Sequence, residues 1–288
     1  MQFKQIPVDK VQQFWDKNPC NVRHSPSKIG TKKYFAEVEK RKYFVEPHIP
    51  KFAEFQKWKG KKVLEIGCGI GTDTISFARA GAQVAAVEIS KKSLELAKKR
   101  AKVYGLQNKI QFYLANAEEL SKIVPVEPYV LIYSFGVIHH TPHPEKVIAE
   151  IKKYTHKNTI IKIMIYHRFA FKVLWILLKF GKGAFWKLDE LIANHSEAAT
   201  GSPVTYVYSK AQAKKLLRDF KIIDMKVDHI FPYSIPDYRK YRYKKVLYFR
   251  LLPKALFHLL ETRFGWHLLI TAKVKEEKKN YENSAFAN

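Results

Sequence analysis

The sequence predicts an α/β fold built on a doubly wound, mostly parallel sheet, and three observations support this prediction. An apolar segment ends at Glu65, and Gly67, Gly69 and Gly71 follow it at alternate positions. From residue 61 onward, strand patterns and helix patterns alternate, as they do when helices connect parallel strands. A second acid, Glu88, ends the next apolar segment, where open α/β sheets bind the sugar of a nucleotide.

The individual elements follow from apolar periodicity, caps and glycines. The predicted strands are residues 63–66, 83–87, 110–114, 129–135, 159–166, 221–230 and 266–274. The predicted helices are residues 8–17, 73–80, 91–104, 144–154, 171–180 and 209–220, with a mixed segment near residues 34–44. Gly81 and Gly105 act as C-caps, Pro144 suits a first helical turn, and Ser209 is an N-cap.

The spacing of the three glycines excludes two common nucleotide-binding loops. A dinucleotide loop needs its third glycine at the position of Thr72, and a P-loop needs a Gly-Lys-Ser/Thr sequence, which is absent. The pattern is instead Glu-x-Gly-x-Gly-x-Gly, and it resembles the first motif of the class I S-adenosylmethionine-dependent methyltransferases. The resemblance implies a Rossmann-like methyltransferase core that binds S-adenosylmethionine, with Glu65 near the cationic, amine-bearing end of that cofactor.

The same resemblance implies the other cofactor-binding residues. Glu88 is expected to accept hydrogen bonds from the ribose, and Asn116 replaces the aspartate that receives the adenine amino group in many relatives. The asparagine oxygen can still accept this hydrogen bond, but without the assistance of a charge. The complete set of expected cofactor-binding residues is Glu65, Gly67, Cys68, Gly69, Gly71, Thr72, Glu88, Ile89, Asn116, Ala117, Ser134 and Phe135.

The loop after the fourth predicted strand carries the candidate catalytic residues. Its Gly-Val-Ile-His-His sequence resembles a run found in many small-molecule methyltransferases. His139 and His140 are candidate bases, because histidine titrates near neutral pH. In the alternative interpretation, one of them packs beneath the cofactor and the other orients the loop. We expect no metal site here, because no carboxylate cluster accompanies these histidines and His143, and prolines constrain the turn.

The segments outside the core are expected to build an acceptor pocket. We expect residues 1–50 to form a helical segment that closes over the cofactor site, residues 51–167 to form the cofactor-binding core, and residues 168–208 to form a lid. Residues 209–274 complete the core and hold a second insertion at residues 231–264, and the charged tail, residues 275–288, is expected to be disordered. The aromatic residues expected to cluster there, mostly as packing and partly as pocket, are Tyr206, Tyr208, Phe231, Tyr233, Tyr238, Tyr241 and Tyr243.

The composition limits the classes of binding partner and the cellular compartment that we expect. The net charge of +26 indicates either a polyanionic partner or simply a lysine-rich proteome, and the even spread of lysines favours the second interpretation. Two cysteines, Cys20 and Cys68, make no disulfide framework, so a reducing cytoplasm is expected. The N-terminus lacks the apolar region of a signal peptide, and no apolar stretch reaches the 18–20 residues of a membrane span.

The function expected from the resemblance is methyl transfer from S-adenosylmethionine to a small-molecule oxygen, nitrogen or thiol sulfur by in-line displacement. One alternative is an RNA or other nucleic-acid methyltransferase that uses the basic surface. The chain lacks the Asn/Asp-Pro-Pro-aromatic run and the nucleophilic cysteine of two such classes. The other alternative is methylation of a lipid at a membrane surface through the helix at residues 171–180. For this helix the sequence favours the buried side of a lid or a dimer contact, because two lysines make a weak polar face.

Overall fold

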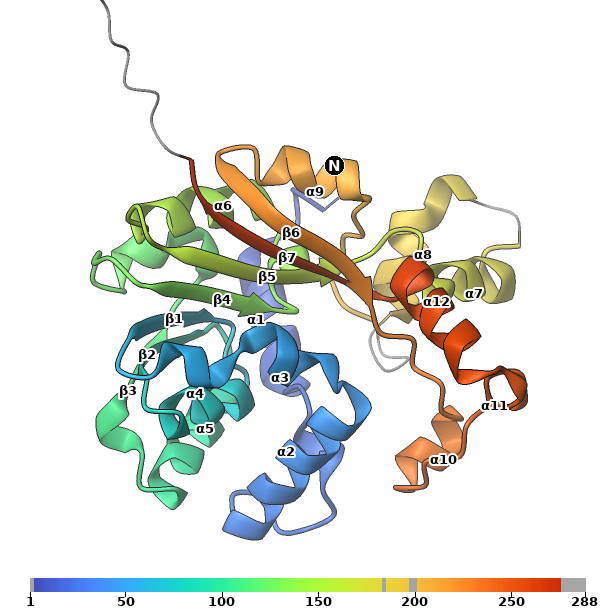
Figure 1. The fold of residues 1–288 in the computed structure, drawn as a ribbon, viewed down its shortest axis with the longest axis horizontal. Helices are drawn as coiled ribbons and strands as arrows, with labels where there is room; N and C mark the ends of the chain where they lie inside the picture. Colours follow the sequence, from blue (N-terminus) through green and yellow to red (C-terminus); the bar gives the residue numbers. More distant parts are fainter. Residues whose placement is uncertain (1–2, 183–184, 197–200, 276–288) are drawn as a thin grey trace, which may run out of the picture.

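The computed structural model describes residues 3–182, 185–196 and 201–275, and it confirms the predicted fold class. A seven-stranded sheet has the order β3-β2-β1-β4-β5-β7-β6, with helices on both faces (Figure 1). Strands β1 to β5 are parallel to one another, and β7 lies antiparallel between β5 and β6. The strands are β1 (Lys62–Ile66), β2 (Gln83–Glu88), β3 (Ile110–Leu114), β4 (Leu131–Phe135), β5 (Ile160–Tyr166), β6 (Phe220–Asp228) and β7 (His267–Val274).

Helices cover both faces of the sheet. Alternate strand residues point to opposite faces, so each face presents apolar side chains that a helix can bury. Leu64 of β1 belongs to the apolar cluster that includes Ile148 of α6, whereas its neighbour Val63 belongs to the cluster that includes Ile75 of α4. The helices are α1 (Val8–Lys17), α2 (Lys32–Val45), α3 (His48–Ala53), α4 (Thr72–Arg79), α5 (Lys91–Val103), α6 (Pro144–Lys153), α7 (Phe171–Phe180), α8 (Leu188–His195), α9 (Lys210–Leu216), α10 (Ile235–Arg239), α11 (Leu247–Leu251) and α12 (Lys254–Phe264).

Three parts of the secondary-structure prediction need correction. The mixed segment near residues 34–44 is the continuous helix α2, whose N-cap Thr31 accepts a hydrogen bond from the backbone N–H of Tyr34. The helix predicted for residues 209–220 ends at Leu216, because Phe220 already pairs with Val274 at the start of β6. Helices α3, α8, α10, α11 and α12 were not predicted; α12 buries none of its side chains, so it carries no apolar periodicity.

The aromatic residues predicted to form one cluster lie in two separate groups. Tyr206 packs against Phe3 near the N-terminus, with ring centroids 5.1 Å apart. Tyr238 instead packs on α2, where the guanidinium carbon of Arg41 lies 4.0 Å from its ring centroid. The two groups are separate because their segments run to different places. Tyr208 forms an isolated β-bridge with His167, just after β5, whereas the segment after β6 turns back toward α2.

The elements beyond the carboxyl ends of the strands leave apolar side chains exposed. Helices α7, α8, α11 and α12 gather at this end of the sheet (Figure 1). Helix α7 buries Val173 and Ile176, while Leu174 and Leu178 are 53% and 77% exposed. The same helix therefore has one buried face and one exposed apolar face.

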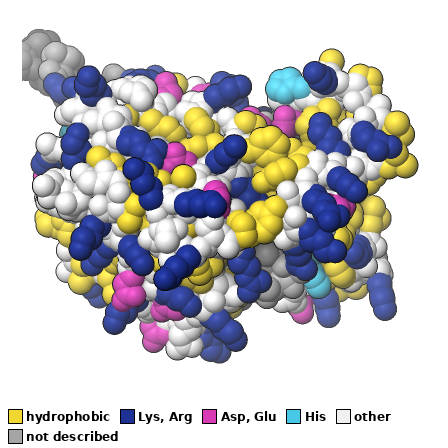
Figure 2. Space-filling view, turned by 90° about the horizontal axis from the view of Figure 1, so that it is seen from below, with side chains coloured by type: hydrophobic (Ala, Val, Ile, Leu, Met, Phe, Trp, Pro, Cys, Tyr) yellow, Lys and Arg dark blue, Asp and Glu magenta, His cyan; other side chains and the backbone are white. Residues whose placement is uncertain are grey.

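Charge is distributed rather than concentrated on the face that Figure 2 displays, where Lys and Arg side chains alternate with apolar ones.

The two cysteines are both free, with Cys20 exposed and Cys68 buried. Within residues 3–182, 185–196 and 201–275, no helix is long and apolar enough to cross a membrane. The tail predicted to be disordered lies, apart from Lys275, outside the described residues.

Candidate active site

The loop between β1 and α4 is shaped by its three glycines. Gly67, Gly69 and Gly71 have φ values of +79°, +54° and +76°, a region that side-chain-bearing residues rarely adopt. The backbone N–H groups of Gly67 and Cys68 donate to the carbonyl of Val87, over 2.8 and 2.9 Å, and fasten the loop to the end of β2. The loop therefore lies at the carboxyl edge of the sheet, where open α/β folds bind their ligands.

The three glycines meet different surroundings. A Cβ on Gly67 would lie 2.1 Å from a methyl carbon of Val137, and a Cβ on Gly71 would lie 3.1 Å from that of Ala97. These two glycines permit close packing against the β4 loop and α5. A Cβ on Gly69 would meet nothing within 4 Å, so Gly69 is the glycine of this loop that borders open space.

Glu88 ends β2 and binds the glycine loop. Its Oε2 accepts a hydrogen bond from the Gly69 N–H over 2.8 Å, and its Oε1 accepts from Ile89 and Ser90 over 3.0 and 2.9 Å. Burial raises the pKa of Glu88, while these three N–H groups oppose the rise. A carboxylate has about four acceptor positions, so one stays available for a hydroxyl of a ligand.

Glu65 lies deeper, at the end of β1. It is buried, and its Oε2 accepts a hydrogen bond from the Thr74 hydroxyl over 2.6 Å. Burial and the neighbouring Asp73 carboxylate raise the pKa of Glu65 to about 8. An adjacent cation would favour its ionised form, which suits the predicted position near a ligand amine.

Asp73 is a central residue of this site that sequence reasoning missed. Its Oδ1 accepts hydrogen bonds from Lys42 Nζ and the Tyr43 hydroxyl over 2.8 and 3.0 Å, and its Oδ2 accepts from the Tyr133 hydroxyl over 3.0 Å. An acid in the first turn of the helix after a glycine loop was the available signal. Its partners on α2 come from a segment that was not recognised as a helix.

Cys68 and Thr72 point into the protein. The Cys68 thiol is buried, and burial raises its pKa well above its ordinary value. The Thr72 hydroxyl accepts a hydrogen bond from Arg100 over 2.6 Å, and Arg100 is itself fully buried. Both side chains are therefore buried, and the hydrogen bond to the Thr72 hydroxyl joins α4 to α5.

The predicted adenine end of the site borders a cavity of about 660 Å³. Ile89 and Asn116 line this cavity together with N-terminal residues that include Pro7, Val8 and Gln12. The Asn116 Oδ1 accepts a hydrogen bond from the backbone N–H of Glu118 over 3.0 Å and begins the 3₁₀ helix that contains the buried Ala117. One side of the cavity is thus built by β2 and β3 and the other by the start of the chain.

His139 and His140 lie in the 3₁₀ helix Ile138–His140, directly after β4. His139 is fully buried, and among the described residues neither of its ring nitrogens makes a hydrogen bond. Its ring centroid is 3.8 Å from that of Tyr166. Burial lowers the pKa of His139 well below its ordinary value, so the imidazole is neutral at pH 7. His140 Nδ1 donates to the Val204 carbonyl over 2.8 Å.

The end of β4 completes this part of the crevice. The buried Ser134 hydroxyl has no hydrogen-bond partner within the described part of the chain. The half-buried Phe135 ring lies 5.5 Å from the ring of His267, between centroids. His143 lies in the following turn, where its backbone N–H donates to Glu118, and it lines the same cavity as Asn116. The predicted residues thus converge on one edge of the sheet, from the β1 loop to the β4 loop.

The sheet order, with Glu88 binding the glycine loop and a histidine loop after β4, defines the class I S-adenosylmethionine-dependent methyltransferases. A family model described as "Methyltransferase domain" matches residues 57–219, more than half of the chain. The chain belongs to this methyltransferase family, and the resemblance inferred from the glycine loop is confirmed.

Individual relatives agree with this family. The chain is 28% identical over 173 residues to a ubiquinone biosynthesis O-methyltransferase of Bordetella parapertussis, covering 52% of this chain and 70% of that protein. It is 34% identical over 99 residues to the Photobacterium profundum enzyme of the same name, covering 34% of this chain and 41% of that protein. The crystal structure of magnesium protoporphyrin IX methyltransferase from Synechocystis PCC 6803 with bound SAH superposes with a TM-score of 0.59 at 16% identity, over 93% of this chain and 100% of that one.

The matches to the curated relatives cover only part of each relative. The chain spans between 36% and 70% of the length of the first three curated relatives. The superposition on the magnesium protoporphyrin IX methyltransferase, with a TM-score of 0.59 at 16% identity, shows a shared fold and nothing beyond it. The substrates in the names of these proteins are therefore statements about those proteins and not about this chain.

Proposed function

We propose that this protein transfers a methyl group from S-adenosylmethionine to a small-molecule oxygen, nitrogen or thiol sulfur. The observation that carries the proposal is the pairing of Gly69, which borders open space, with the Glu88 carboxylate at 2.8 Å. A bound S-adenosylmethionine supplies an electrophilic methyl group on a sulfonium ion, and the protein supplies position and electrostatics.

The residues present fit this cofactor. The backbone of residues 67–72 would contact the methionine part, with Glu65 near its ammonium group. Glu88 and Ile89 would hold the ribose, and Asn116 with Ala117 would hold the adenine at the cavity that both Ile89 and Asn116 line. The unpartnered Ser134 hydroxyl and the Phe135 ring would border the transferred methyl group.

His139 and His140 are the proposed acid–base residues. A neutral imidazole accepts a proton from a hydroxyl or amine acceptor as its nucleophilic atom attacks. The lowered pKa of His139 keeps this imidazole neutral, and its two ring nitrogens lack partners among the described residues. A carboxylate or thiolate acceptor needs no such base, and His139 would then only pack beside Tyr166.

The N-terminal segment and the lid have proposed roles as well. Residues 1–50 would close over the cofactor, since residues 4–9 and Gln12 line the cavity beside Asn116. The insertions at residues 168–208 and 231–264 would enclose the acceptor at the carboxyl edge of the sheet. We place the reaction in the cytoplasm, because the two cysteines form no disulfide framework.

Isothermal titration with S-adenosylmethionine and S-adenosylhomocysteine tests the proposal first. We expect stoichiometric binding by the full chain and none by the Gly69→Arg variant. Gly105→Arg is the matched control, because Gly105 has φ +67° and also faces open space, at the end of α5. A labelled-methyl screen against a metabolite pool then identifies the acceptor. Absence of cofactor binding by the wild-type chain would refute the proposal.

A second candidate is methylation of a lipophilic acceptor at a membrane surface, and the exposed face of α7 favours it. Trp175 and Leu178 are 41% and 77% exposed there. Co-sedimentation with anionic liposomes should be lost when both become aspartate and kept in Ile123→Asp, a 56% exposed control site. No sedimentation of the wild-type chain removes this candidate. The nucleic-acid alternative gains no support from the relatives, and a filter-binding assay without a steep salt dependence would eliminate it.

A further inference from the structure

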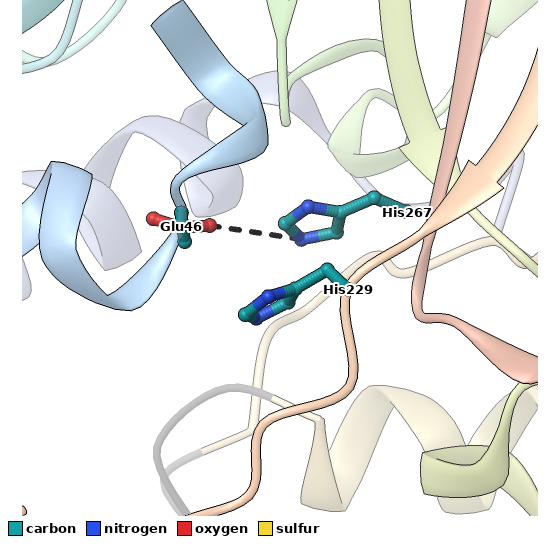
Figure 3. A group of neighbouring side chains, drawn as sticks. All are labelled: Glu46, His229 and His267. Atoms are coloured by element: carbon teal, nitrogen blue, oxygen red, sulfur yellow. Dashed lines mark ion pairs between the residues drawn. The ribbon is translucent and has the colours of Figure 1, made fainter. Parts of the chain in front are cut away.

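A second group of polar side chains lies at the carboxyl edge of the sheet, beyond β5. His267 begins β7, His229 directly follows β6, and Glu46 is the C-cap of α2 (Figure 3). Asp228 and His267 are opposite each other in the antiparallel pairing of β6 with β7, which brings the two histidines together. Three segments that are far apart in the sequence thus meet at one point.

The geometry of this group matches a set of metal ligands. One nitrogen from each of His229 and His267 and a carboxylate oxygen of Glu46 all lie within 4.8 Å of one another. His267 Nε2 is 3.8 Å from Glu46 Oε1, and the two imidazole rings are stacked with centroids 4.7 Å apart. Both histidines are buried, and the Glu46 side chain is 20% exposed.

A further histidine orients this group. His48, at the start of α3, pairs its Nε2 with His267 Nδ1 over 2.8 Å. Because Nδ1 of His267 is occupied in this way, its Nε2 points toward Glu46 and His229. Metal-binding histidines ordinarily have their second ring nitrogen held by such a partner, which fixes the tautomer and the ring.

The backbone also holds His229 in place. His229 has φ +73°, a left-handed conformation that costs a non-glycine residue on the order of 1–3 kcal/mol. Its carbonyl accepts a hydrogen bond from the Trp266 N–H over 2.7 Å. A Cβ on Gly265 would lie 2.2 Å from the Asp228 carbonyl oxygen, so glycine is required for this close approach. The contact keeps His229 beside His267.

We propose that Glu46, His229 and His267 bind a divalent transition-metal ion of the zinc type. Two imidazoles and one carboxylate are a donor set that zinc uses in catalytic sites, and such sites keep a fourth position open. Zinc bonds of about 2.0–2.2 Å place tetrahedral ligand atoms about 3.5 Å apart. The ligand atoms now lie within 4.8 Å of one another, with His267 Nε2 3.8 Å from Glu46 Oε1, so side-chain movements of about an ångström would bring them to this spacing.

The site borders the proposed methyl-transfer crevice. The Phe135 ring centroid lies 5.5 Å from that of His267 and 6.0 Å from that of His48. An ion held here would be close to Phe135 at the end of β4, and it could bind an anionic oxygen or sulfur of an acceptor placed beside that ring. This role of the ion rests on the proposed function, whereas the metal site itself stands on its own geometry.

Metal binding is tested on the full chain, purified without a polyhistidine tag and without cofactor or acceptor. After exposure to Zn²⁺ and desalting, we expect about one zinc per chain by mass spectrometry of the metal content. Co²⁺ in its place should give the visible absorption of a tetrahedral nitrogen and oxygen site. His229→Ala, His267→Ala and Glu46→Gln should each weaken Zn²⁺ affinity at least about tenfold. His258→Ala, at an exposed position of α12, is the matched control.

The outcomes separate the two proposals. Glu46→Gln preserves shape at a partly exposed position, so it keeps the test valid if a histidine variant fails to fold. Zinc binding that Glu46→Gln and His229→Ala leave unchanged, or no stoichiometric zinc in the wild-type chain, would overturn the metal site. Zinc binding without S-adenosylhomocysteine binding would preserve the metal site and remove the proposed function. Cofactor binding without zinc would do the reverse.

Discussion

The backbone N–H of Gly69 donates a hydrogen bond to the Glu88 carboxylate over 2.8 Å. This contact joins the loop after β1 to the end of β2. Because the same carboxylate is the proposed ribose acceptor, the shape of the loop and the sugar site depend on each other. Loss of the carboxylate charge should therefore affect both cofactor binding and stability.

The Glu88→Gln variant tests this dependence. The amide places an NH₂ group among three backbone N–H donors and leaves one of them without an acceptor. We expect the free energy of unfolding to fall by about 1–3 kcal/mol, the cost of a buried unsatisfied donor. The affinity for S-adenosylhomocysteine should fall by roughly tenfold to hundredfold, because a charge-assisted hydrogen bond contributes about 1.5–3 kcal/mol.

Urea unfolding and isothermal titration measure these two effects. Glu95→Gln, an exposed acid on α5, is the control and should change neither quantity. Unchanged cofactor affinity in Glu88→Gln would contradict a ribose role for this carboxylate, even with a loss of stability.

The glycine loop allows stability and binding to be separated. Gly67→Ala creates both a strained φ and a methyl group 2.1 Å from Val137, so it should lower stability by several kcal/mol. Gly69→Ala adds strain of about 1–2 kcal/mol but no clash, and it should mainly weaken cofactor binding, by about tenfold or more. Gly105→Ala has a similar φ and open surroundings away from the crevice, so it controls for strain alone.

Thermal unfolding and titration with S-adenosylhomocysteine report on the three variants. Equal cofactor affinity in Gly69→Ala and Gly105→Ala would show that the open side of Gly69 is not the cofactor site.

The predicted core was accurate where the signals are local. The bounds predicted for residues 110–114 agree with β3, and those for residues 171–180 agree with α7. Ser209 caps α9 as predicted, and Gln212 completes a capping box with it. Each of these signals lies within a few residues of the element that it defines, so one sequence suffices to detect it.

The remaining features depend on long-range packing. Glu46, His229 and His267 have no informative spacing; the antiparallel pairing of β6 with β7 brings the two histidines together, and the end of α2 adds Glu46. Helix α12 exposes Leu256 and Leu259 and buries no side chain, so periodicity cannot reveal it. The candidate cofactor residues could be named from motifs, whereas the inward direction of the Cys68 and Thr72 side chains is set by burial and by the contact with Arg100.

The role of His139 is tested by removing its nitrogens while keeping its volume. Because both ring nitrogens are buried without partners among the described residues, His139→Leu should leave stability within about 1 kcal/mol or raise it. If His139 is the base, kcat should fall by about 10² to 10⁴ with the acceptor found in the methyl screen. His258→Leu on α12 is the control.

Activity that survives in His139→Leu would assign the histidine to packing against Tyr166 and indicate an acceptor that needs no base at this position. His140→Leu removes a hydrogen bond to the Val204 carbonyl. The Ser202 hydroxyl also donates to this carbonyl, over 2.9 Å. That second donor keeps the carbonyl satisfied, so His140→Leu should also fold.

The raised pKa of Glu65 predicts how stability depends on pH. Burial beside Asp73 raises this pKa from 4.5 to about 8, so between these values the folded protein holds a proton that the unfolded chain releases. The contribution of Glu65 to stability is therefore full at low pH and is lost as pH rises toward 8, with a limiting slope of about 1.4 kcal/mol per pH unit. Glu65→Gln keeps the hydrogen bond from Thr74 and cannot titrate. Urea unfolding at pH 5.5, 7 and 8.5 should show the wild type losing stability relative to Glu65→Gln as pH increases, and a difference that stays constant or grows in favour of the wild type would mean that Glu65 is ionised in the fold.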